Sequence, residues 1–182
     1  MKAEIENAVA IAESYRNSHD GEIPVLVIAH GANGEQNVYV GNFRPHKNHI
    51  GQDQVMFCSV MRSAFAINGV ERYEFLVKPE FNYIQAQMTK NVLAVVAVSK
   101  DGKSVEWFEI EDEALVPYFS EMPVEGLFSR LLPTDAERAK EFTGKEIDGI
   151  RSYLKYCTFV PPTTSNESNA EDAFASLLEA FQ

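Results

Sequence analysis

Two apolar segments separated by a tight turn constrain the fold of this chain more than any other feature. They are Val92–Val98 and Val105–Ile110, and the dipeptide Asp101-Gly102 lies between them. Asp-Gly readily adopts the two positive φ angles of a type I′ turn, which joins neighbouring antiparallel strands. The sequence therefore predicts a β-hairpin over this region.

The turn also predicts how the two strands pair. With the dipeptide as a two-residue loop, Lys100 lies opposite Lys103 and Val98 lies opposite Val105. Apolar side chains then occupy both faces of the hairpin, and strands of this kind are typical of the interior of a sheet. We therefore expect a larger sheet around the hairpin, and a structural role for it.

Three more segments have the composition of strands: Val25–Ile28, Asn37–Phe43 and Arg72–Val77. Between the second and the third lies Gln52–Ile67, whose apolar residues cover most of a helical circumference, so a buried helix is predicted. Together with the hairpin, these elements indicate the α+β class. We expect a sheet of about five strands, antiparallel or mixed, with the buried helix across it and further helices at both ends.

The expected end helices have their own sequence signals. Ala3–Tyr15 carries apolar residues at helical spacing. Thr134 with Glu137, and Thr143 with Glu146, match the capping box that opens helices. The proline-containing segment before these boxes is predicted to form short helical turns over the sheet.

The composition is that of an acidic globular domain. The chain has 182 residues, 45% of them hydrophobic, and we assign residues 1–160 to a single α+β domain. Its formal charge of −11 argues against direct nucleic-acid binding, which needs a basic surface. Solubility is the simplest explanation of this charge, and mimicry of DNA is the alternative.

The same features bear on where the protein is expected to reside. No segment has the pattern of a secretory signal or approaches the ~20 apolar residues of a membrane span. Cys58 and Cys157 both lie in apolar patterns and are expected to be reduced and buried. We expect no membrane partner and a cytoplasmic location, in the host cytoplasm or the virion if the protein is viral.

The end of the chain has a different character. Residues 161–169 are predicted to form a polar linker, and residues 170–182 a C-terminal amphipathic helix. Four apolar side chains fall on one face of this helix, with the spacing of a helix that binds in a groove. These partner-binding candidates are Phe174, Leu177, Leu178 and Phe181. The pattern leaves open whether the helix docks on its own domain or on a partner.

Few residues suggest chemistry. His46 and His49 lie three positions apart in a polar loop, but zinc needs three or four ligands and no third one is indicated. They are weak metal candidates, and no metal or other cofactor is expected. His30 ends a predicted strand before a glycine-containing turn, where catalytic residues often lie, yet no partner for it is apparent. No catalytic residue is therefore assigned.

The order of the elements carries a resemblance. A strand pair is followed by a helix ending at Asn68–Tyr73, by the strand Tyr73–Val77 and then by the Asp-Gly hairpin. Over Pro24–Ile110 this order resembles a group of small α+β proteins of unknown function from phages, prophages and marine bacteria. The resemblance implies no functional residue, but it raises the expectation of a phage-encoded accessory or virion protein.

These observations favour a non-enzymatic interaction or accessory protein that engages a protein partner through its C-terminal helix. A structural subunit, self-associating through the same helix, is a related possibility. The enzymatic alternative is a small hydrolase-like or metal-dependent enzyme with a site near His30, His46 and His49.

Overall fold

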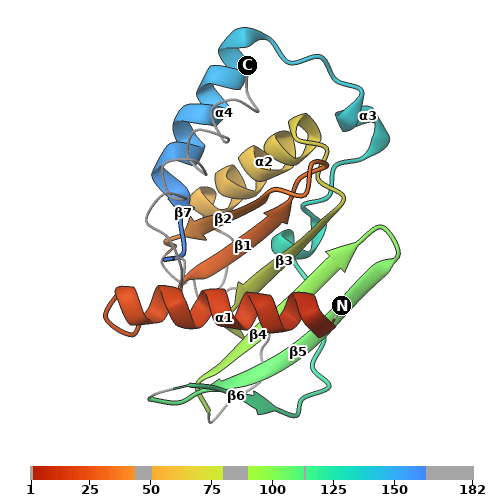
Figure 1. Ribbon diagram of the computed structural model, residues 1–182. Coiled ribbons are helices and arrows are strands. Elements are labelled where there is room, and N and C mark those ends of the chain that lie inside the picture. The colour runs from red at the N-terminus through yellow and green to blue at the C-terminus, as the bar shows by residue number, and fades with distance from the viewer. Residues whose placement is uncertain (1, 44–50, 80–89, 113, 163–182) are drawn as a thin grey trace.

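The computed structural model describes residues 2–43, 51–79, 90–112 and 114–162. Within these ranges, seven strands form one antiparallel sheet in the order β6-β5-β4-β3-β1-β2-β7 (Figure 1). The strands are β1 Val25–His30, β2 Gln36–Gly41, β3 Arg72–Val77, β4 Val92–Ser99, β5 Gly102–Ile110, β6 Leu115–Tyr118 and β7 Thr158–Phe159. The helices are α1 Lys2–Ser18, α2 Gln52–Ile67, α3 Asp135–Arg138 and α4 Gly144–Cys157, with a 3₁₀ helix, η2, at Leu127–Arg130.

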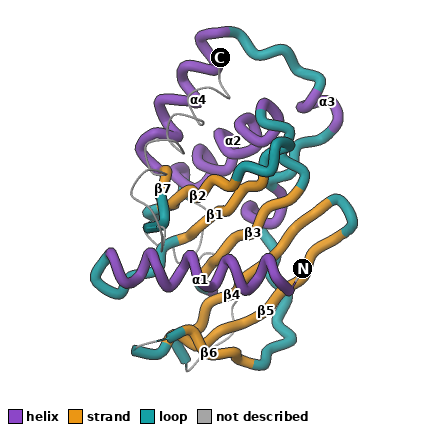
Figure 2. Tube along the Cα trace, viewed as in Figure 1, coloured by secondary structure: helices purple, strands orange, loops and turns teal. Residues whose placement is uncertain are grey.

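Helices cover both faces of the sheet, which gives the described part of the chain three layers (Figures 1 and 2). Successive side chains of a strand point to opposite faces, so each inner strand supplies both cores. Leu26 and Ile28 of β1 pack under α1, whereas Val25 and Val27 belong to the core shared with α2, α4 and η2. The apolar character of these strands on both faces is explained by this arrangement.

The α+β class is confirmed, and the predicted number of strands is wrong. The five expected strands are present, but the sheet has seven. β6 contains Pro117 and lies at the sheet edge, where the missing N–H of proline is tolerated. β7 has two residues and pairs with Val38 and Tyr39 of β2. Neither strand is long enough to show the alternation of apolar and polar residues by which a strand is predicted from sequence.

The predicted hairpin is present, and its register differs by two residues. Ser99 pairs with Gly102, so the loop is Lys100-Asp101, and Val98 faces Lys103 instead of Val105. The φ of Gly102 is +140° while Asp101 keeps a negative φ, which rules out the expected type I′ turn. A shift of two residues leaves every side chain on its predicted face. Both strands lie inside the larger sheet, as predicted; β4 is buried on both faces, whereas β5 is buried only at Trp107 and Phe108.

α2 begins and ends where the sequence predicts, but it is not buried all round. The left-handed Gly69, with φ of +61°, follows its last turn, and the N–H of Val70 donates to the carbonyl of Phe65 at 2.9 Å. Val55 and Met56 face away from the sheet and are 50% and 53% exposed. One side of α2 packs into the core that it shares with the sheet, α4 and η2, and Val55 and Met56 lie outside that core.

The segment before α3 closes the core beside α2. Phe128 of η2 and Leu131 are buried there, which confirms the expected helical turn over the sheet. The hydroxyl of Tyr73 donates to the carbonyl of Phe128 at 2.7 Å and accepts from the N–H of Leu131 at 3.1 Å. One buried side chain from β3 thus satisfies two backbone groups of an irregular segment.

Both predicted capping boxes are confirmed. Thr134 and Glu137 open α3, and Thr143 and Glu146 open α4, each pair with reciprocal side-chain and backbone hydrogen bonds. The first helix, Lys2–Ser18, agrees with the helical spacing predicted over Ala3–Tyr15. Near the end of this helix, Arg16 donates to the carbonyl of Asp112, and Glu13 accepts from the N–H of Leu115. These hydrogen bonds hold the helix to the turn between β5 and β6.

The two cysteines differ in burial. Cys58 of α2 is 4% exposed, as expected, whereas Cys157 at the end of α4 is only partly buried, and both are free thiols. Burial raises the pKa of the Cys58 thiol to about 12 and that of Cys157 to about 11. None of the helices in the described ranges combines the length and apolar character needed to cross a membrane.

Candidate functional site

A buried pair of ionisable side chains lies under the first half of α1. Nε2 of His30, at the end of β1, is 2.5 Å from Oε2 of Glu74 in β3. The Glu74 side chain is 1% exposed and that of His30 is 12% exposed. Glu74 lies opposite Ile28 and Ala97, so a carboxylate is held among apolar neighbours on the α1 face of the sheet. Buried ionisable pairs occur at functional sites and also in ion pairs with a structural role.

Further polar contacts tie α1 to the same end of the strands. Arg72 donates to Glu4 at 3.0 Å, and Asn7 donates to Gln36 at 2.9 Å. Arg72 and Gln36 are also the register partners of His30 in the two neighbouring strands. The His30–Glu74 pair therefore sits inside a polar group that fixes the start of α1 over the sheet.

Sequence reasoning found His30 and missed Glu74. The available signal was the alternation of β3, in which Tyr73, Phe75 and Val77 share one face and leave Glu74 on the other. The sequence does not show that β3 lies between β4 and β1, where this second face is also buried. Pairing His30 with Glu74 needs the β1–β3 register, which the local sequence does not specify.

The other histidine candidates lie outside the described residues, so His46 and His49 are not placed. Phe43 is the last described residue before them. It follows β2 at the end of the sheet opposite His30, since Val25 pairs with Gly41 and His30 pairs with Gln36. Among the described residues, no group of three or more His, Cys, Asp or Glu side chains is arranged to hold a metal ion.

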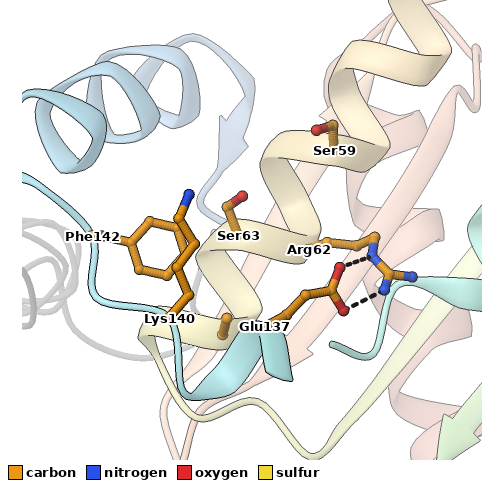
Figure 3. Close-up of a pocket in the computed structure, with 7 residues that line it drawn as sticks. Ser59, Arg62, Ser63, Glu137, Lys140 and Phe142 are labelled. Atoms are coloured by element: carbon orange, nitrogen blue, oxygen red, sulfur yellow. Dashed lines mark hydrogen bonds and ion pairs between the residues drawn. The ribbon is translucent and has the colours of Figure 1, made fainter. Parts of the chain in front are cut away.

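A small polar pocket lies between the outer face of α2 and the segment around α3 (Figure 3). Its volume is about 190 Å³. It is lined by Ser59, Arg62, Ser63, Ala66, Glu137, Lys140 and Phe142. Figure 3 shows the Arg62 guanidinium and the Glu137 carboxylate facing each other across one wall, while Lys140 and Phe142 form another.

Both cations of the pocket already have carboxylate partners. Arg62 makes a two-pronged contact with Glu137, with donor–acceptor distances of 3.1 Å and 2.5 Å, and also donates to the carbonyl of Arg130. Lys140 donates to Glu146 at 2.8 Å and lies 4.6 Å from the ring centroid of Phe142. These contacts join α2 to the segment between η2 and α4, and they leave the pocket electrostatically balanced.

Hydrogen bonds from Arg62, and then from the backbone and hydroxyl of Thr134, lower the pKa of Glu137 from 4.5 to about 2. Because the folded pKa lies below the unfolded one, the contact stabilises the fold above about pH 4.5 and is lost as the pH falls toward 2.

In Arg62→Gln, we expect the Glu137 carboxyl titration followed by NMR to move up toward 4.5. The same titration in Lys145→Gln, an exposed change on α4, should match the parent, and an unmoved midpoint in Arg62→Gln would contradict this assignment.

The glycine-containing turn after β1 is a hairpin loop whose backbone groups bond within the fold. The N–H of Gly31 donates to the carbonyl of Glu35 at 2.9 Å, and that of Gly34 donates to Gly31 at 3.0 Å. The N–H of Ala32 donates to the carbonyl of Asn68 at 3.4 Å. These backbone donors are used within the fold, so they do not converge on a ligand.

Comparison with known proteins adds no assignment. No protein-family model, curated protein or solved structure matches the chain. The predicted partner-binding residues Phe174, Leu177, Leu178 and Phe181 also lie outside the described residues. The His30–Glu74 pair and the Arg62–Glu137 pocket are therefore the candidate sites that the described geometry provides.

Proposed function

We propose that this protein is a non-enzymatic interaction protein that engages a protein partner through residues 170–182. The observation that carries the proposal is the apolar stripe at i, i+3, i+4 and i+7 behind a polar linker. The stripe consists of Phe174, Leu177, Leu178 and Phe181. A helix this short is marginal in water, so such a stripe needs an apolar surface to form against.

The charges of this segment specify the chemistry of the partner. Residues 163–182 contain four acidic side chains and no lysine or arginine. The acidic residues are Glu167, Glu171, Asp172 and Glu179. A complementary surface therefore has an apolar groove for the stripe and basic residues at its rim. Rim contacts are solvent-exposed, so we expect association to weaken as salt rises from 50 mM to about 500 mM.

The body supports this role as a rigid carrier. Two apolar clusters, one on each face of the sheet, form its core within the described residues. The resemblance of Pro24–Ile110 to small phage and prophage proteins favours an accessory or virion function, directed at a host or structural protein.

The test is affinity capture with the full-length chain and with Phe174→Ala/Leu178→Ala. Truncating two anchors of a helix in a groove costs about 2–4 kcal/mol or more, so we expect partner binding to fall at least tenfold. A synthetic peptide of residues 163–182 should compete with the parent for the captured protein. The purified partner is then used for affinity measurements at low and high salt.

Ala175→Ser/Ser176→Ala is the matched control, because both positions lie off the stripe in the same segment. It should bind the partner as the parent does. Equal capture by the parent and the stripe variant, or no competition by the peptide, would show that residues 170–182 are not the binding element.

A second candidate is acid–base chemistry at His30, which the contact with Glu74 favours. A carboxylate hydrogen-bonded to an imidazole orients the ring, as in nucleophile–His–carboxylate sites. Hydrolysis of simple aryl esters by the parent and by His30→Gln tests this candidate directly. Equal hydrolysis rates in the two proteins would show that His30 has no catalytic role in this reaction.

A further inference from the structure

Apolar side chains are unusually exposed where α2 begins and α4 ends. Four large ones lie there, at 41% to 91% exposure: Val55, Met56, Tyr156 and Val160. α2 and α4 are in contact, and Figures 1 and 2 both show the first turn of α2 beside the last turns of α4. Val160 follows β7, which directly continues α4. We refer to these four residues as the α2–α4 patch.

The patch lies close to the end of the described residues. Val160 is followed by Pro161 and Pro162, and residues 163–182 come next. Seven residues of linker, 163–169, span at most about 25 Å when extended. A helix over residues 170–182 is about 20 Å long. The apolar stripe of that segment can therefore reach the patch without any change in the body.

We propose that, in the free protein, residues 170–182 dock on the α2–α4 patch of their own chain, and that a partner must displace them. This regulation rests on the function proposed above. A short tether gives a docking segment an effective concentration in the millimolar range, which favours the same chain over a second copy. Lys155, exposed beside Tyr156, is a basic neighbour for the acidic segment.

Docking in the free protein weakens partner binding, because only chains whose segment is released can bind. The apparent association constant equals the intrinsic one multiplied by the fraction of released chains. A patch that no longer holds the segment should therefore raise partner affinity. Val55 and Met56 are suitable positions, because both are half exposed and their replacement leaves the buried face of α2 intact. We expect Val55→Ser/Met56→Ser to bind the partner several-fold more tightly than the parent.

Methyl NMR on the full-length chain tests the docking directly. We expect contacts between the Met56 ε-methyl and the Leu177 or Leu178 δ-methyls, unchanged on tenfold dilution, in a monomer of 20.4 kDa. The Met56 resonance should move in Phe174→Ser/Leu178→Ser and stay in place in Phe119→Ser. Phe119 is a matched control because it is 87% exposed beside β6, outside the patch.

Two results would overturn the proposal. One is a Met56 resonance that is identical in the parent and in Phe174→Ser/Leu178→Ser, with no contact between the methyls. The other is a dimeric mass with contacts found only between differently labelled copies, which assigns the patch to a second copy. Docking without partner capture would instead refute the proposed function alone, and capture without docking would refute only the regulation.

Discussion

Replacing Phe128 by alanine is expected to lower the free energy of unfolding by about 3–5 kcal/mol, the usual cost of a large aromatic cavity in a core. The side chain is 1% exposed. Its ring centroid lies 6.0 Å from that of Phe43, 6.5 Å from Phe57 and 6.2 Å from Phe75. Phe128 thus joins η2 to α2 and β3, and its loss affects contacts on both.

Urea denaturation of the parent and the variant measures this loss. Phe119→Ala is the matched control, since the same side chain at 87% exposure should change stability by less than about 0.5 kcal/mol. The slope of the transition should stay the same, because the unfolded chain exposes similar surface. A Phe128→Ala variant as stable as the control would show that η2 is not part of the core.

Replacing His30 by alanine is expected to destabilise the fold by about 3–5 kcal/mol, because it leaves the Glu74 carboxylate without its partner in an apolar site. Glu74 is 1% exposed and faces Ile28 and Ala97 across the neighbouring strands. The cost comes mainly from leaving a buried polar group without a hydrogen-bond partner and less from the lost contact itself.

A second substitution separates these two causes. In His30→Ala/Glu74→Leu, the buried carboxyl group is replaced by an apolar side chain of similar size, so we expect more than half of the lost stability to return. Thermal and urea unfolding of the parent, the single variant and the double variant give the comparison. A double variant less stable than His30→Ala would mean that Glu74 has a further structural role.

The secondary structure of this chain could largely be predicted, because its signals are local. α2 follows from its apolar residues and from Gly69, which ends it with a positive φ. The capping boxes at Thr134 and Thr143 span four neighbouring positions each, and both are formed. The central strands could be predicted from their amino-acid composition alone.

The hairpin register shows where local signals stop. Asp101-Gly102 has the preferred residues for a type I′ turn, yet the loop is Lys100-Asp101 and Gly102 belongs to β5. Pairing β4 with β3 and β5 on both sides fixes the register by side-chain packing over the whole strand. A two-residue turn preference is too weak to override that packing.

The sequence by itself determined the α+β class, the main helices and strands, and which faces of the strands are apolar. Those properties depend on neighbouring residues and on periods of two or 3.6 positions. Only the tertiary structure decided that Glu74 meets His30, that Tyr73 supports η2, and that Met56 is left exposed. These pairings join residues far apart in the chain, and which ones meet depends on the order and register of strands, which the packing of the whole domain sets.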